Sequence, residues 1–351
     1  MTLSARRPAG SAVHPTSSSA ASRAGIPLLL KLSLSALLLA SVLMRVDVAS
    51  LQGTISRSDL ALLGLAVAVS FAAWLVNTLK WQRLLPRSQA GPGYLELLRL
   101  NFIGMFYNLF IPGQVGGEVV KSVKLARAGV GATAAAVSVV SDRVTGLLAL
   151  FVVGVVGVIL SPSMVGSAPS LVPWIAGCGF TLAIASTILL TRMGHAALLA
   201  VEKILFDCCR QIGWNLHIDS SIPATSGPLS PALVLVLAVV FQSMAVYANL
   251  LLCEALGIPL SFAQLLWIVA AVALVQSLPI SVAGLGIREG TYVALLQQQG
   301  IDASSALALS LAVFAIQLLM ATTGWLLEVR GLLRKDMPRV PGVPLSGSSS
   351  Q

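Results

Sequence analysis

The chain has 351 residues, of which 56% are hydrophobic and 10% are charged, and its mean hydropathy is +0.90. Soluble domains carry about a quarter charged residues, so this composition excludes an ordinary globular enzyme and predicts an integral membrane protein. The net charge is +9, but the basic residues lie between apolar runs. They indicate cytoplasmic anchors that face anionic lipid, and they exclude nucleic acid as a partner. The four cysteines and three histidines lack disulfide or ligand spacing, so we expect no metal and no cofactor.

The chain begins with residues 1–25, which are rich in Ser, Ala and Arg and have no apolar periodicity. This composition predicts a disordered cytoplasmic tail. The next run, 26–44, is the weakest candidate span because Lys31 interrupts it about one turn from its start. A cleaved signal peptide is the alternative interpretation of this run. Residues 26–330 are expected to form one membrane domain, and 331–351 a disordered basic tail.

The apolar runs predict about six full transmembrane helices. Lys80, Arg83 and Arg87 follow the second of them and place its end in the cytoplasm. The polar connection at 192–230 is expected to be a cytoplasmic interfacial segment. The six runs are 26–44, 60–79, 132–160, 172–190, 233–253 and 303–327.

Two shorter elements, near 94–128 and 265–300, contain Pro/Gly breaks. The first has basic residues on both flanks, so we expect it to enter from the cytoplasm and return there as a re-entrant hairpin. If the second element crossed completely, the final span would place the basic tail outside. A second re-entrant hairpin, entering from the outer side, keeps all basic clusters in the cytoplasm. The predicted fold is therefore an all-α polytopic membrane protein with two helical hairpins of opposite orientation, as in inverted-repeat transporters.

The first break predicts a cavity, because irregular backbone at membrane depth must be covered by protein or line water. The short helix after it is expected to present free N–H groups that attract phosphate or carboxylate, with Lys121 adding a positive charge one turn later. The alternative is a tight turn at the glycines, with Lys121 as a surface anchor. The candidate headgroup-binding residues here are Asn108, Pro112, Gly116, Gly117, Glu118 and Lys121.

The second break contains Pro279, Gly284, Gly286, Arg288 and Glu289, all of them candidate site residues. Charges at this depth usually face partners or water, and an arginine can contact a phosphate through two hydrogen bonds. We therefore expect the arginine to bind a headgroup, with the glutamate paired to it or to a cation across the cavity. In the alternative, both lie in the outer headgroup layer as an anchor.

Asp142 and Arg143 are also candidates, and the sequence leaves open whether they are buried or interfacial. Two other groups have structural expectations only. Tyr107, Trp81 and Trp267 are expected in interfacial belts. Interhelical hydrogen bonds are expected from Gln242, Asn249, Gln276 and Gln317.

Three stretches resemble the membrane region of lysylphosphatidylglycerol synthases and their stand-alone, flippase-like relatives. They are 108–121 (NLFIPGQVGGEVVK), 138–147 (SVVSDRVTGL) and 278–292 (LPISVAGLGIREGTY), and the likeness covers about 26–330. Members often have Asp, Arg and Glu where this chain has Glu118, Lys121 and Asp142, and lysine cannot reproduce the bidentate contact of arginine. This departure leaves the headgroup preference open.

In the two-domain synthases a soluble C-terminal domain transfers the amino acid, and the membrane domain is associated with moving the lipid between leaflets. About 24 residues follow the last predicted span here, so the resemblance implies translocation or binding of an anionic phospholipid or a lipid-linked or polyprenyl phosphate. It argues against aminoacyl transfer. Membrane lipids are the expected partners, and the expected location is a cell membrane, the bacterial inner membrane, with both termini cytoplasmic.

Two alternatives remain: a membrane-embedded lipid or glycolipid transferase, and a non-catalytic partner of a lipid-modifying enzyme. No DxD or HExxH-like constellation supports the transferase, so we expect that the chain is not an enzyme. For a translocator, Arg288→Ala and Glu118→Ala should abolish lipid movement without preventing folding.

Overall fold

The computed structural model describes residues 53, 54, 56–85, 92–110, 116–161, 231–277 and 284–336. All regular structure in this part of the chain is helical. Its eight helices are α3 (Leu60–Leu84), α4 (Tyr94–Phe110), α5 (Gly116–Arg127), α6 (Ala132–Leu160), α10 (Pro231–Ala255), α11 (Phe262–Gln276), α12 (Ile287–Gln297) and α13 (Ala303–Asp336).

Four of these helices, α3, α6, α10 and α13, are long and apolar enough to cross a membrane. They confirm the predicted runs that begin near residues 60, 132, 233 and 303. The predicted spans at 26–44 and 172–190, both terminal tails and the connection at 192–230 lie outside the described residues. The helical segments on either side of each break also form, as α4 and α5 around the first and α11 and α12 around the second.

The helix starts have local causes in the sequence. The Asp59 side chain accepts hydrogen bonds from the Ala61 and Leu62 amides and caps α3. Ser261 caps α11 in a reciprocal arrangement with Gln264, in which each side chain bonds the other's backbone N–H. Gly286 precedes α12 with a φ of 80°, a conformation that favours glycine. These residues determine where the three helices begin, and Gly286 is the one that follows a break.

The described helices form two halves, each with a long helix, two shorter helices and a second long helix. The first half has helices of 25, 17, 12 and 29 residues, and the second has 25, 15, 11 and 34. The first residues of three pairs of equivalent helices are separated by the same number of residues along the chain. These pairs are Leu60 and Pro231, Gly116 and Ile287, and Ala132 and Ala303. This equal spacing indicates an internal repeat that relates α3–α6 to α10–α13.

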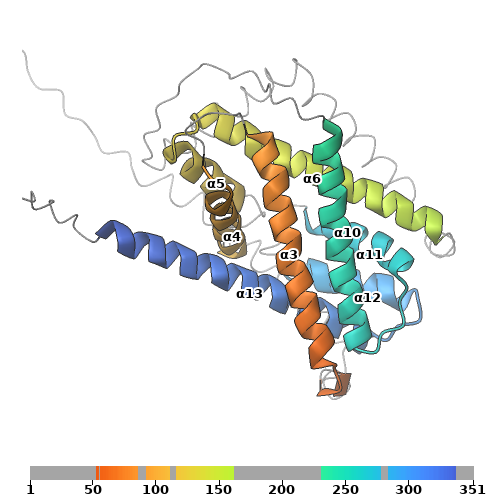
Figure 1. Ribbon diagram of the computed structural model, residues 1–351. Helices are drawn as coiled ribbons and strands as arrows, with labels where there is room; N and C mark the ends of the chain where they lie inside the picture. Colours follow the sequence, from red (N-terminus) through yellow and green to blue (C-terminus); the bar gives the residue numbers. More distant parts are fainter. Residues whose placement is uncertain are drawn as a thin grey trace, which may run out of the picture.

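The halves run in opposite directions and interlock. The Asp59 amide at the start of α3 donates to the Ala255 carbonyl at the end of α10 at 3.0 Å, so these two helices are antiparallel neighbours. Figure 1 shows them side by side at the centre. Around this pair the packing is crosswise: α4 of the first half contacts α13 of the second, and α11 of the second contacts α6 of the first.

Small residues allow the crosswise helices to approach closely, as is common where membrane helices pack. A Cβ atom added at Gly154 of α6 would lie 2.9 Å from the Ala270 Cβ of α11. At Gly324 of α13 it would meet the carbonyl group of Phe102 of α4. The main apolar core is formed mostly by the second half, with Leu252, Leu265 and Leu307 among its members, and Phe102 and Val153 of the first half pack into it.

Candidate functional site

A cavity of about 350 Å³ lies between the two halves. It is lined by α3, α4, α5 and α6 of the first half and by α10, α11 and α13 of the second. Its volume falls in the range of about 300–1,000 Å³ that is typical of ligand sites. The polar and charged residues that line it are Asn77, Lys80, Asn101, Asn108, Glu118, Lys121, Asp142, Arg143, Gln242, Gln276, Ser277 and Gln317.

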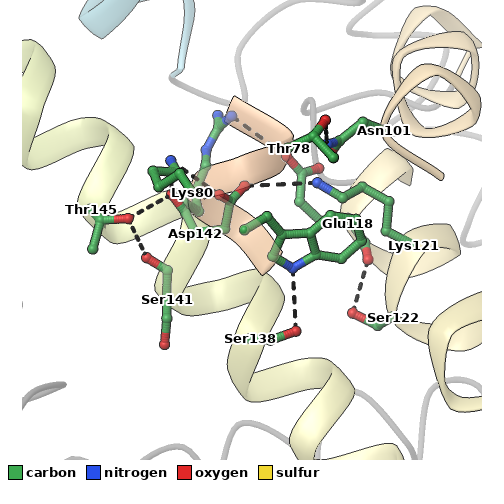
Figure 2. Close-up of polar contacts among 12 residues, drawn as sticks. Thr78, Lys80, Asn101, Glu118, Lys121, Ser122, Ser138, Ser141, Asp142 and Thr145 are labelled. Carbon is green, nitrogen blue, oxygen red and sulfur yellow. Dashed lines mark hydrogen bonds and ion pairs between the residues drawn. The ribbon is translucent and has the colours of Figure 1, made fainter. Parts of the chain in front are cut away.

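Lys121 of α5 is held between an aromatic ring and a carboxylate. Its Nζ lies 4.3 Å from the centroid of the Trp81 ring and 3.8 Å from Oδ2 of Asp142. The residue is 8% exposed, so it is no surface anchor. Figure 2 shows Lys121 and Lys80 converging on Asp142. The ring and the carboxylate together can hold a desolvated ammonium group beside the cavity.

Two glycines make room for this lysine. A Cβ atom at Gly104 of α4 would lie 2.8 Å from Cδ of Lys121, so the lysine side chain crosses α4 where α4 has no side chain. At Gly117 of α5 a Cβ atom would collide with the Gly104 carbonyl oxygen and lie 2.8 Å from Cγ of Asn108. The Gly104–Gly117 crossing therefore fixes the position of Lys121 relative to α4.

Lys80 of α3 is a site residue that sequence reasoning placed among the cytoplasmic anchors. It is 1% exposed, and its Nζ lies 3.0 Å from Oδ1 of Asp142 and 3.1 Å from the Asp142 carbonyl oxygen. That interpretation was wrong for this residue, because the helix continues to Leu84 and keeps Lys80 inside the bundle. The signal in the sequence was Asn77, a polar residue one turn earlier on the same helix face.

Asp142 and Arg143 of α6, left open between burial and the interface, both line the cavity. The Asp142 side chain is 12% exposed and that of Arg143 is 41% exposed. Nη1 of Arg143 lies 3.5 Å from Oε1 of Glu118, which joins α6 to the start of α5. The other carboxylate oxygen of Glu118 is buried and accepts no hydrogen bond from the described residues.

The charged groups that line the cavity have a positive excess. Lys80, Lys121 and Arg143 contribute three positive charges, and Glu118 and Asp142 contribute two negative charges, which leaves one positive charge in total. A site with this balance is complementary to one anionic group such as a phosphodiester. Among the described residues, no group of three His, Cys, Asp or Glu residues could hold a metal ion.

The side chain of Asn108 of α4 reaches the start of α5, where free N–H groups were expected. Its Oδ1 accepts a hydrogen bond of 2.7 Å from the Gly117 amide. This N–H is therefore satisfied by the protein and is not one of the free donors expected at the start of α5. The basic side chains, rather than this backbone donor, carry the positive potential of the cavity.

Arg288 and Glu289 at the start of α12 form a closed network. Each is 1% exposed, and the Arg288 Nη2 contacts the Glu289 carboxylate. Nε of Arg288 donates to Ser310 Oγ at 3.2 Å, and Nη1 donates to Gln317 Oε1 at 2.9 Å. Glu289 also accepts from the Gly286 amide at 2.6 Å. The pair predicted from the sequence is present, and Arg288 is held by protein partners.

A second cavity of about 240 Å³ adjoins the first. It is lined by Arg288, Tyr292 and Asn249, and the Tyr292 hydroxyl donates to Asn249 Oδ1 at 2.8 Å. Seven residues line both cavities: Trp74, Met105, Phe241, Gln242, Ala273, Gln276 and Gln317. The structure thus brings described residues on both sides of the two predicted breaks to two adjoining cavities.

The remaining candidate site residues from the sequence are two glycines and two prolines. Gly116 is buried at the start of α5, and Gly284 has a φ of 75° in the turn before α12, a conformation that favours glycine. Pro112 and Pro279 lie outside the described residues.

The residues with structural expectations have mixed outcomes. Trp81 and Trp267 are buried rather than interfacial, and Trp81 donates to Ser138 Oγ at 3.3 Å. Tyr107 donates to Glu328 at 3.4 Å. The predicted interhelical bonds are confirmed for three amides: Gln242 donates to the Gly146 carbonyl, and Gln317 and Asn249 accept from Arg288 and Tyr292.

Comparison with known proteins agrees with the resemblance seen in the sequence. The family described as the lysylphosphatidylglycerol synthase TM region matches residues 28–324. Searches of curated proteins and of solved structures gave no significant match. The matched range contains α3 to α12 and most of α13, and therefore both cavities. The chain belongs to the lysylphosphatidylglycerol synthase transmembrane-region family.

Proposed function

We propose that this protein is a lipid translocator that carries a phosphate-bearing headgroup through the cavity while the acyl chains stay in the bilayer. An anionic phospholipid and a lipid-linked or polyprenyl phosphate are the substrate classes that fit. The observation that carries this proposal is the cluster of Lys80, Lys121, Asp142, Glu118 and Arg143 around a cavity in an otherwise apolar bundle.

The cost of buried charge supports this role. One charged side chain at the centre of a membrane helix costs roughly 2.5–3.5 kcal/mol on insertion scales, so charges at depth accompany partners, water or substrate. Most of the charge in the cluster is internally neutralised, and one positive charge is left over. A translocator needs this balance, because a site with several uncompensated cations would hold a phosphate too tightly to release it.

The arrangement of the helices supports transport as well. On this proposal, α4–α5 and α11–α12 are re-entrant hairpins that enter from opposite faces, and the antiparallel contact between α3 and α10 supports opposed halves. Opposed repeats with a site at their interface are the organisation that permits alternating access. Six spans would then place both termini in the cytoplasm of a cell membrane, the bacterial inner membrane.

The energy source is expected to be the lipid gradient or an ion gradient. The sequence contains no GxxxxGK[ST] motif, so direct use of ATP is not part of the proposal. If protons are coupled, Glu118 and Asp142 are the carboxylates that face the cavity.

The test is leaflet exchange in liposomes that contain the purified full chain. Wild-type protein should make inner-leaflet fluorescent phosphatidylglycerol accessible to an external quencher. Lys121→Gln and Glu118→Gln should slow this exchange at least tenfold. Lys124→Gln is the matched control, because Lys124 lies on the same helix but pairs with Glu328 and does not line the cavity.

The same preparation separates the alternatives. A new lipid product would favour a membrane-embedded transferase, and binding of a lipid-modifying enzyme without exchange or product would favour a non-catalytic partner. Normal exchange by both cavity variants would contradict the proposed route.

A further inference from the structure

We propose that Gln242, Gln276 and Gln317 form a subsite for an uncharged, hydroxyl-bearing group attached to the phosphate. This inference rests on the proposed function and adds a determinant of substrate choice. The three glutamines come from α10, α11 and α13 of the second half, and all three line both cavities. They therefore lie where a headgroup bound in the first cavity would extend into the second.

The junction between the cavities is polar but carries no charge. None of the seven residues that line both cavities is ionisable, in contrast to the five charged residues that line the first cavity alone. The side-chain amide of glutamine offers donors and an acceptor together, which matches a hydroxyl group that both donates and accepts. Arg288, which bonds Gln317, is neutralised by Glu289, so a second phosphate or an ammonium group would find no unpaired counter-charge at this point.

In two of the three glutamines, only one of the two polar atoms of the side-chain amide hydrogen-bonds a described residue. Gln242 donates from Nε2 to the Gly146 carbonyl at 3.1 Å, which leaves its Oε1 without a hydrogen bond to a described residue. Gln317 accepts a hydrogen bond from Arg288 through Oε1, which leaves its Nε2 without a hydrogen bond to a described residue. Each of these bonds also fixes the direction in which the amide points. The protein thus supplies one oriented acceptor and one oriented donor.

Gln276 has a different environment. Its side chain packs on the turn before α12, where a Cβ atom at Gly284 would lie 2.7 Å from Cγ of Gln276. Neither end of its amide hydrogen-bonds another described residue. A glycine with a φ of 75° therefore makes room for an amide that does not hold helices together. Among the three, Gln276 is the residue whose amide can be replaced without breaking a hydrogen bond to a described residue.

Two aromatic side chains complete the junction. Trp74 and Phe241 are in edge contact, with ring centroids 5.5 Å apart, and both line the two cavities. Apolar faces beside oriented amides suit a small carbon skeleton with hydroxyl groups, such as glycerol or a sugar. They lower the local dielectric, so each hydrogen bond to a hydroxyl discriminates more strongly against a ligand that lacks it.

The experiment compares two fluorescent probes with the same phosphodiester charge in liposomes of the full chain. Phosphatidylglycerol has two hydroxyl groups, and phosphatidylpropanol has the same three-carbon ester without them. Wild-type protein should exchange phosphatidylglycerol faster, by ~5-fold for each hydrogen bond formed. Gln276→Leu should slow the exchange of phosphatidylglycerol by about this factor and leave the exchange rate of phosphatidylpropanol unchanged. An unchanged rate for phosphatidylpropanol also shows that the variant is folded.

Gln297→Leu is the control, since Gln297 is exposed at the end of α12 and lines neither cavity. Equal wild-type rates for the two probes, or equal slowing of both by Gln276→Leu, would overturn the subsite while leaving translocation intact. If neither probe is exchanged by wild-type protein, the proposed function fails and the subsite fails with it.

Discussion

The two short helices α5 and α12 occupy equivalent places in the repeat and use the same residue differently. Glu118 and Glu289 are each the third residue of their helix. Glu118 lines the larger cavity and pairs with a half-exposed Arg143, whereas Glu289 is sealed against Arg288. One half therefore presents charge to the cavity, and the other uses charge to join α12 to α13. An inverted repeat need not divide its chemistry equally.

The largest expected loss of stability comes from breaking the buried Arg288–Glu289 pair. Arg288→Met would leave the Glu289 carboxylate buried without its cation, which typically costs about 3–5 kcal/mol. Thermal unfolding in detergent should show this loss, and the double variant Arg288→Met/Glu289→Gln should recover most of it. A single variant as stable as wild type would show that Arg288 is not a structural residue. For this reason Glu118, rather than Arg288, now gives the clearer test of transport.

A smaller loss is expected from Asp142→Asn, which removes the carboxylate shared by Lys80 and Lys121. Hydrogen bonds to charged groups contribute about 1.5–3 kcal/mol, and the asparagine retains an acceptor, so we expect the lower part of this range. Lipid exchange should fall more steeply than stability, because the two lysines would repel each other across the cavity. If exchange followed stability alone, the cluster would be structural, like the pair in α12.

Gly104→Ala should move the Lys121 side chain, which lies against Gly104. The added methyl group would displace the lysine side chain from above α4 at a cost of about 1 kcal/mol in stability. Exchange of anionic lipid should slow several-fold. Gly64→Ala is the matched control, since a Cβ atom at Gly64 meets nothing within 4 Å and should be neutral in both measurements. Unchanged exchange in Gly104→Ala would show that the exact place of Lys121 is unimportant.

The smallest effect is expected at Lys124, which lies 2.7 Å from the Glu328 carboxylate. The lysine side chain is 31% exposed, so Lys124→Gln should cost less than about 1 kcal/mol. Lipid exchange should be unchanged when measured beside Lys121→Gln. A strong exchange defect would extend the functional region from the cavity to the α5–α13 contact.

The sequence predicted the long helices well because a run of apolar residues determines the length of a membrane helix almost independently of its neighbours. It predicted the breaks because Pro112, Pro279 and the glycines near them interrupt apolar helical runs, and the helices on both sides of each break are present. It could not assign Lys80, since a lysine near the end of an apolar run is consistent with both an anchor and an ion pair. Only the approach of α6 to α3 distinguishes these cases.

The glutamines show a second limit of sequence reasoning. Gln242 and Gln317 were expected to join helices, and they do, but the pattern of residues did not reveal that both face one space. That space exists because α4 packs on α13 and α11 on α6, a long-range pairing without a local signal. The internal repeat would have suggested it, since Glu118 and Glu289 are equally placed in their segments.

The helix α13 has a mechanical consequence that follows from its length. At 1.5 Å per residue its 34 residues extend about 50 Å, which exceeds a hydrocarbon core of about 30 Å. Arg288 donates hydrogen bonds to Ser310 and Gln317 in the first half of α13, and Lys124 pairs with Glu328 nearer its end. A tilt of α13 would therefore shift α12 with it through the buried Arg288 network, whereas the part-exposed Lys124–Glu328 pair, whose loss should leave exchange unchanged, would hold α5 only loosely.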